Sequence, residues 1–387
     1  MATATETRAR SRSIPWRAVG AVGVGLFGLG LAVGSYGAYV TLLIASGVGP
    51  DAAGFGMSLF LLGQLLAVVP ADRLTRTMRV ERVGALGLAG AGIGIAIGAS
   101  VTLETTYLSR LLLGLGQGTA FVAGMKYVGL RTAGADTATA QGMLGALFTL
   151  GLAVALAASP PAVDALGPTA PALAAAASTL LGAALTLRLA PVTGNSITPV
   201  RAYIEPFTSA DGLALGLGNM ATFGFLMVAA TWYTDVLAGV AVPSVVILVG
   251  FALATVLGRG LGGWLSRGHG ERATVAGSLL GLTIVLGGLA ASIAADSAVG
   301  IAAGLVLTGF GFGIPFGPLF SLAFSELADD PGVTLSGMLL VGNAGALAYP
   351  WLVGRLLTAT AGYAAGFAAM GLSVGAIWLL WVRTIGH

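Results

Sequence analysis

Long apolar runs, broken at intervals by charges, prolines or glycines, dominate this sequence and restrict what it can fold into. Only 9% of the residues are charged, and the mean hydropathy is +0.94, whereas roughly a quarter of the residues in a soluble domain are charged. A helix that crosses a membrane needs roughly 20 mostly apolar residues. The composition therefore excludes a soluble enzyme, a disordered chain and a disulfide scaffold, and it predicts a multi-pass membrane protein.

Twelve of these runs are long enough to cross the bilayer as helices. They start near Ala18, Ala52, Val83, Thr105, Thr139, Thr169, Gly212, Val242, Ala273, Ala298, Thr334 and Tyr363. We therefore expect an all-α polytopic protein with twelve transmembrane helices. The 62 glycines would weaken soluble helices, but in a bilayer small residues let helix backbones approach closely. We interpret the glycine-rich strings as packing surfaces, not as nucleotide-binding loops.

The basic residues predict which side of the membrane each loop occupies. If the arginine-rich N-terminal tail is cytoplasmic, every basic residue except Arg355, Arg110 and Arg259 falls on the same side, which is 15 of 18. Cytoplasmic loops are enriched in arginine and lysine. We therefore expect a plasma-membrane protein with both termini in the cytoplasm and with residues 1–17 as a tail that sets the topology.

The second half of the chain repeats the first at an offset of 195 residues. The aligned pairs are Gly63-Gln64 with Gly258-Arg259, Gly114, Gly116 and Gly118 with Gly309, Gly311 and Gly313, and Gly142-Met143-Leu144 with Gly337-Met338-Leu339. Parallel repeats of this kind occur in secondary transporters. We expect two pseudo-symmetric six-helix bundles, 18–190 and 209–387, joined by a cytoplasmic linker at 191–208.

Polar side chains occupy only some of the predicted spans. Buried amides and cations lie on spans 2, 4, 7, 8 and 11, and they are Gln64, Arg110, Gln117, Asn219, Arg259 and Asn343. Spans 3, 6, 9 and 12 carry none. Because polar side chains in a bilayer face protein or water, we expect every third helix to be peripheral and the others to surround a central cavity.

Two stretches of the sequence resemble a known family. The loop after the second span reads VVPADRLTRTMR, and the fourth span reads SRLLLGLGQGTAF. Both are similar to motifs of the major facilitator superfamily, and the resemblance covers all twelve spans. It implies alternating access, in which two rigid bundles rock about a site near the bilayer midplane.

The resemblance also implies that the loop after the second span latches the cytoplasmic side when the cavity faces outward. Its Asp72 can pair with Arg76 or with the positive N-terminus of a helix in the other half. We therefore expect Asp72, Arg73 and Arg76 to act in gating. The alternative is that the arginines only enforce topology. This copy departs from the family motif at Val68 and Thr75, where the motif has glycines.

Arg259 is the deeper of the two arginines within the membrane. It precedes Arg267 by eight residues, which places it about 12 Å from the cytoplasmic end. Its surroundings, LGRGLGGWLS, are similar to the eighth span of nitrate/nitrite porters and of several organic-anion members. Those porters have a second arginine where this chain has Gln64. Arg259 can alternatively pack on helix carbonyls as a gate element, and Arg110, nearer the outer end, can snorkel.

The distribution of charge favours an anionic solute. All 15 acidic residues can be placed in loops or at helix ends, so no carboxylate is available within the membrane to neutralise a cationic drug and carry its proton. Two buried arginines would attract an anion. We predict a secondary transporter of a small organic or inorganic anion, with a co-transported proton or ion. The predicted substrate contacts are Arg259, Arg110, Gln64, Gln117, Asn219 and Asn343.

Three other functions stay open. An exporter of hydrophobic compounds would need neither buried arginine. A polytopic membrane enzyme needs acid–base or metal-binding groups gathered at a membrane face, but the one acidic cluster, Glu326, Asp329 and Asp330, has no histidine nearby. A transport-dead sensor or scaffold is the third. Since the chain has no cysteine and two histidines, we expect no metal, no cofactor and no catalytic residue, and no nucleic-acid partner.

Overall fold

The computed structural model describes residues 14–132, 135–193, 199–327, 330–360 and 362–384. Most of the predicted N-terminal tail and part of the predicted linker lie outside these ranges. The elements are α1 (Trp16–Gly34), α2 (Tyr36–Ala45), α3 (Pro50–Thr77), α4 (Val80–Ile97), η1 (Gly98–Ser100), α5 (Leu103–Gly129), α6 (Ala135–Leu166), α7 (Thr169–Leu187), η2 (Val200–Tyr203), η3 (Glu205–Thr208), α8 (Ala210–Asn219), the π-helix η4 (Met220–Gly224), α9 (Phe225–Ala238), α10 (Ser244–His269), α11 (Glu271–Ala294), α12 (Ala298–Gly313), α13 (Phe316–Glu326), α14 (Pro331–Ala346), α15 (Tyr349–Thr360) and α16 (Ala364–Thr384).

These helices confirm the predicted all-α polytopic fold. Eleven helical stretches among the described residues are long and apolar enough to cross a membrane. The remaining predicted span is α5, a helix of 27 residues, which is less apolar because it carries Arg110, Gln117 and Lys126. Several spans consist of two helices in line. The tenth breaks between Gly313 and Phe316, where Pro315 has no N–H to continue the helix.

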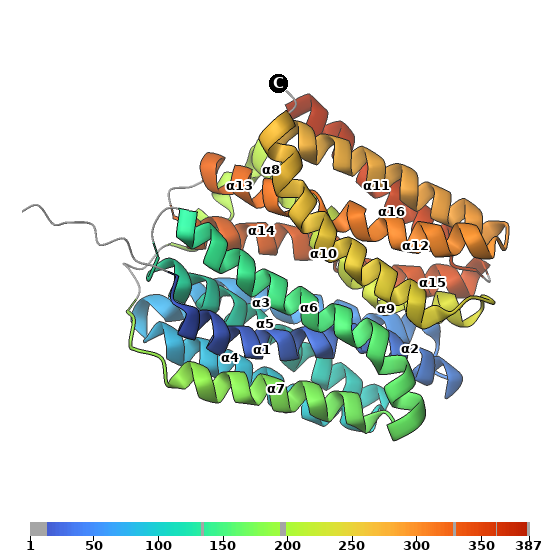
Figure 1. Ribbon diagram of the computed structural model, residues 1–387, viewed down its shortest axis with the longest axis horizontal. Coiled ribbons are helices and arrows are strands. Elements are labelled where there is room, and N and C mark those ends of the chain that lie inside the picture. The colour runs from blue at the N-terminus through green and yellow to red at the C-terminus, as the bar shows by residue number, and fades with distance from the viewer. Residues whose placement is uncertain (1–13, 133–134, 194–198, 328–329, 361, 385–387) are drawn as a thin grey trace, which may run out of the picture.

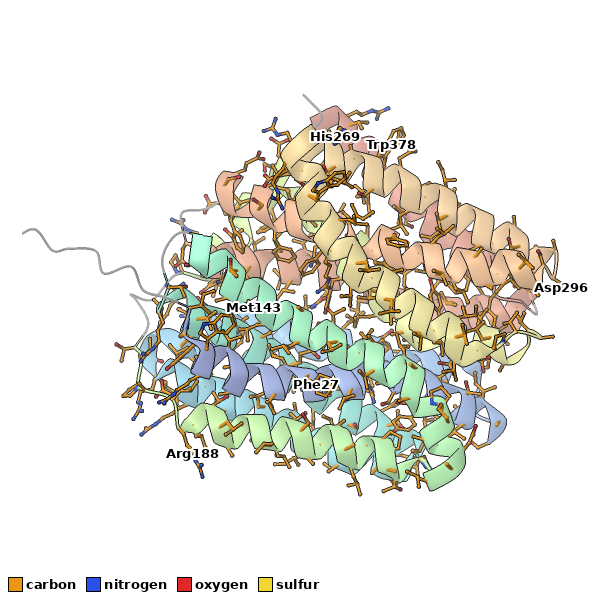
Figure 2. The ribbon with its side chains drawn as sticks, viewed as in Figure 1. Phe27, Met143, Arg188, His269, Asp296 and Trp378 are labelled. Carbon is orange, nitrogen blue, oxygen red and sulfur yellow. The ribbon has the colours of Figure 1, made fainter. Side chains whose placement is uncertain are left out.

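The helices form two halves that lie side by side. Figure 1 shows α1 to α7 (blue to green) below and α8 to α16 (yellow to red) above, and the chain leaves α7 toward the linker at the left end of the bundle. We call this end the linker end and the opposite end the far end. In Figure 2, Arg188 lies at the linker end and Asp296 at the far end. The charge-based topology predicts that these two residues lie on opposite sides of the membrane.

Four helices, α4, α7, α11 and α16, are peripheral. In the part of the chain that the structure describes, each packs substantially only within its own half. The main contacts between the halves are made by α2, α3 and α6 with α9, α10, α14 and α15. The prediction that every third span is peripheral is therefore confirmed. The central helices, which carry the predicted polar residues, are the ones that face protein.

Glycines let these central helices pack backbone against backbone. A Cβ atom on Gly114 of α5 would lie 2.1 Å from the carbonyl oxygen of Phe60 on α3. At the equivalent position of the repeat, a Cβ on Gly309 of α12 would lie 2.4 Å from the carbonyl oxygen of Phe251 on α10. The repeat in sequence is thus a repeat in packing, and the interpretation of the glycine strings as packing surfaces is confirmed.

Replacing Gly114 by alanine is expected to destabilise the fold by about 1–3 kcal/mol, because the added methyl group overlaps the Phe60 carbonyl and forces α5 away from α3. The measurement is the melting temperature of the purified protein in detergent. Gly90→Ala is the matched control, since a Cβ on Gly90 would meet nothing within 4 Å. Equal melting temperatures for the two variants would contradict the packing role.

Candidate substrate site

A small cavity lies at the centre of the molecule, between the two halves. It has about 20 Å³ of room, roughly that of one water molecule. Five of the six predicted substrate contacts line it: Gln64 on α3, Gln117 on α5, Asn219 on α8, Arg259 on α10 and Asn343 on α14. The site therefore draws on both halves of the repeat.

Glycines on neighbouring helices help to position Gln64 and Arg259, the two polar residues that the repeat aligns. A Cβ on Gly118 would lie 3.1 Å from the carbonyl oxygen of Gln64, and one on Gly313 would lie 3.1 Å from the backbone nitrogen of Arg259. In both halves a glycine-containing helix, α5 or α12, thus packs closely against the backbone of the helix that bears the polar side chain. Close packing on that side leaves the side chain directed to the interior of the bundle.

Arg259 is a partly buried cation with no counter-charge beside it in the described part of the chain. Its Nη1 donates to the carbonyl oxygen of Gly145 on α6 at 3.3 Å, and its Cζ lies 4.0 Å from the centre of the Phe316 ring. Its Nε is buried and has no hydrogen-bond partner among the residues that the structure describes. Among the described residues no carboxylate lies within ion-pair distance of it. The aromatic face and one carbonyl offset part of the cost of removing this charge from water.

One pair of amide side chains joins the two halves across the cavity, and another amide bonds within the C-terminal half. Asn343 Nδ2 donates to Gln64 Oε1 at 2.9 Å, which links α14 to α3. Asn219 Nδ2 donates to the carbonyl oxygen of Met338 at 3.1 Å. Asn219 directly precedes the π-helix η4, and such wide turns are frequent at functional sites.

Two phenylalanines close the cavity on its far side. Phe148 of α6 lies one turn beyond Gly145 toward the far end, and Phe223 of η4 lies one turn beyond Asn219 in the same direction. Their ring centres are 6.2 Å apart. Because α6 and η4 belong to different halves, this pair separates when the halves separate at the far end.

Arg110 does not line this cavity. It is only 4% exposed, its Nη1 donates to the carbonyl oxygen of Ala32 at 3.1 Å, and its Cζ lies 4.3 Å from the centre of the Tyr36 ring. Ala32 lies in the last turn of α1, whose carbonyl groups carry partial negative charge. Arg110 is therefore stabilised at the break between α1 and α2, inside the protein, and neither snorkels nor joins Arg259.

Asp72 lies at the linker end, and its side chain is fully buried. It accepts hydrogen bonds from Arg76 Nε at 2.6 Å, Lys126 Nζ at 2.9 Å and the Tyr203 hydroxyl at 2.5 Å. Burial, and then the bond to Asp72, raise the pKa of Tyr203 above its usual range. Tyr203 therefore remains a protonated donor at physiological pH.

Arg76 extends this cluster into the other half. Its Nη2 donates to Asp330 Oδ2 at 2.9 Å, and Asp330 caps α14 by accepting from the Gly332 N–H at 2.8 Å. A Cβ on Gly332 would lie 3.2 Å from Asp72 Oδ1, so Asp72 also lies against the positive N-terminus of α14. Both partners that the sequence suggests for Asp72 are thus present. Arg73 is exposed and forms no ion pair within the described ranges.

We call Asp72, Arg76, Lys126, Tyr203 and Asp330 the linker-end cluster. Sequence reasoning does not identify the last three as gating residues. The sequence offered one clue that could have drawn attention to Lys126, because it is the only lysine in the chain. Tyr203 had none, since nothing in its local sequence points to a partner 131 residues away. Across the residues that the structure covers, no group of three or more histidine, aspartate or glutamate side chains could hold a metal ion.

Two halves of membrane-crossing helices that meet around a central cavity, with amides and an arginine in its wall, are an arrangement typical of membrane transporters. The chain belongs to the Major Facilitator Superfamily, whose profile matches residues 22–349. It is similar in fold to the crystal structure of the human organic anion transporter MFSD10 (TETRAN), with a TM-score of 0.69 and 19% sequence identity, over 95% of this chain and 99% of that chain. Among curated proteins, none matches this sequence.

Membership of this family makes the chain a multi-pass membrane transporter and not an enzyme. The membrane-enzyme alternative is therefore set aside. The similarity to nitrate/nitrite porters has no counterpart in these comparisons and stays a prediction from the sequence.

Proposed function

We propose that this transporter carries a small anion, organic or inorganic, and binds it at Arg259. The observation that carries the proposal is the guanidinium group of Arg259, which lines an enclosed cavity without a carboxylate partner among the described residues. A buried charge without a counter-charge is costly, and a bound anion would supply one. The amides of Gln64, Gln117, Asn219 and Asn343 would orient the anion. The fold similarity to a protein described as an organic anion transporter agrees with this proposal.

Transport proceeds by alternating access, with bundles 18–190 and 209–387 rocking about the cavity on the linker 191–208. The halves meet at the linker-end cluster and also at the far end, where a Cβ on Gly54 would lie 2.3 Å from the carbonyl oxygen of Pro350. Each gate must therefore open in turn. A proton that accompanies the anion can travel on the substrate itself.

The linker end faces the cytoplasm in this proposal, because the basic residues gather there. Both termini then lie on the cytoplasmic side of the plasma membrane. Asp72 and Arg76 act as the cytoplasmic latch through their contacts with the other half, and Arg73, which is exposed, contributes through topology. Arg110 acts as a brace at the break between α1 and α2.

Uptake by purified protein in liposomes tests the proposal. Nitrate, formate, lactate and succinate form the anion panel, and tetraphenylphosphonium and ethidium form the cation panel. We expect saturable uptake of at least one anion, above that of protein-free liposomes, and no saturable uptake of either cation. Saturable cation uptake without anion uptake would overturn the proposal.

A hydrophobic-compound exporter is the second candidate, because five phenylalanines line the same cavity. They are Phe121, Phe148, Phe223, Phe316 and Phe320. Aromatic walls of this kind bind apolar and cationic compounds. In this alternative the flux of such compounds would survive neutral replacement of Arg259.

A further inference from the structure

Three buried oxygen atoms at the central cavity accept no hydrogen bond from any described residue. They are Gln117 Oε1, Asn219 Oδ1 and Asn343 Oδ1, on side chains that are 2%, 0% and 0% exposed. All three residues line the same cavity as Arg259. Most buried polar atoms in proteins are hydrogen-bonded, so a group of unpaired acceptors at one cavity requires an explanation.

The orientation of the Asn219 amide follows from its neighbour. Its Nδ2 donates to the carbonyl oxygen of Met338 at 3.1 Å, and a carbonyl oxygen can only accept. Turning the amide over would bring two acceptors together. The Oδ1 of Asn219 is therefore the atom left unpaired, and a side-chain amide oxygen accepts hydrogen bonds but cannot donate them.

Asn343 adds a second acceptor from the same half. Its Nδ2 is engaged by Gln64 Oε1 at 2.9 Å, which leaves its Oδ1 unpaired. The bond to Gln64 spans the two halves, so separation of the halves also frees the Gln64 oxygen. The same separation frees the Asn343 N–H, so a wider cavity gains one acceptor and one donor.

The site therefore offers two kinds of recognition. Arg259 supplies positive charge and N–H donors, and the amides supply unpaired acceptors. An anion with acceptors only, such as nitrate, satisfies Arg259 but turns lone pairs toward the amide oxygens. An anion that also bears a hydroxyl or ammonium group satisfies both.

We infer that the solute is a small molecule that joins an oxyanion group to its own hydroxyl or ammonium donor, such as a hydroxy carboxylate or a zwitterionic amino carboxylate. The inference rests on the proposed anion transport, and it narrows the substrate class of the same site. The carboxylate binds Arg259, and the donor groups bind Asn219 Oδ1 and its neighbours. An analogue without the donor leaves these oxygens unpaired and binds more weakly.

Equilibrium dialysis on the purified protein in detergent tests this inference with three radiolabelled acids of one carbon skeleton. Propionate has no donor, L-lactate adds a hydroxyl, and L-alanine adds an ammonium group. We expect lactate or alanine to bind with a dissociation constant at least about tenfold lower than that of propionate. Nitrate is the competitor without donors and is expected to displace them weakly.

Three variants show which residues recognise the donor group and which residue binds the carboxylate. Asn219→Leu is expected to weaken binding of the preferred acid about tenfold and to weaken binding of propionate clearly less. Asn343→Leu is the second test, in case the first variant does not fold. Arg259→Gln is expected to weaken all three acids together.

The possible negative results distinguish a failure of the donor inference from a failure of the proposed anion transport. Equal binding of propionate and lactate, both dependent on Arg259, would overturn the donor inference and leave anion transport standing. Binding of neither donor-bearing acid would overturn it as well, and the liposome uptake of nitrate and formate would then show whether anion transport survives. Uptake of cations alone would overturn both.

Discussion

Replacing Arg259 by glutamine is expected to lower anion uptake about 100-fold at low substrate concentration. Arg259 is the one cation among the described residues that line the cavity, and glutamine keeps an amide donor but loses the charge. Truncating one partner of a buried, hydrogen-bonded charge pair costs roughly 2–5 kcal/mol, and about 3 kcal/mol corresponds to about 100-fold in affinity. Uptake into liposomes, measured with the anion that the panel identifies, checks this.

Two further variants make that result specific. Arg259→Lys keeps the charge but loses the planar fork of donors, so it should fall between the wild type and Arg259→Gln. Arg267→Gln removes an exposed charge from the same helix and should leave uptake unchanged. If Arg259→Gln folds normally and still carries the anion, Arg259 is a gate element, and the exporter becomes the better explanation.

Replacing Asp72 by asparagine is expected to open the linker end. The variant keeps the size of the side chain, but Arg76 and Lys126 both lose the carboxylate that they share. Removing one partner of a buried ion pair costs about 3–5 kcal/mol, and this cost is relieved when the cluster separates and becomes hydrated. The equilibrium should therefore move toward the state that is open at the linker end, by at least about tenfold.

The absence of cysteine from the chain makes this shift easy to measure. Val68 is fully buried and lines the cavity on the linker side, so Val68→Cys reports access from that end. In everted vesicles, a membrane-impermeant maleimide should label it at least tenfold faster when Asp72→Asn is present. Arg73→Gln is the control, because Arg73 is exposed, and it should leave the rate unchanged. Equal labelling with and without Asp72→Asn would show that the cluster is not a latch.

Much of the cavity could be predicted because a membrane leaves polar side chains few places to go. Gln64, Asn219 and Asn343 are amides in apolar runs, and such groups turn toward protein or water. Arg110 was harder to place. It shares a helix face with Gln117, but seven residues correspond to about 10 Å along the helix axis. The spacing of residues along a helix predicts which face a side chain occupies. It does not predict where along the bundle a neighbouring helix is interrupted, and Arg110 bonds at such an interruption, between α1 and α2.

The sequence by itself determined the twelve spans, the two repeated halves, the glycine contacts and the polar residues of the central helices. Each of these follows from local hydrophobicity or from spacing along one helix. The tertiary structure alone decided the partners, such as Asp330 for Arg76 across 254 residues. It also decided which amide oxygens at the cavity stay unpaired. A hydrogen bond between distant segments forms only where tertiary packing brings the two segments together. The local sequence of either segment does not specify that packing.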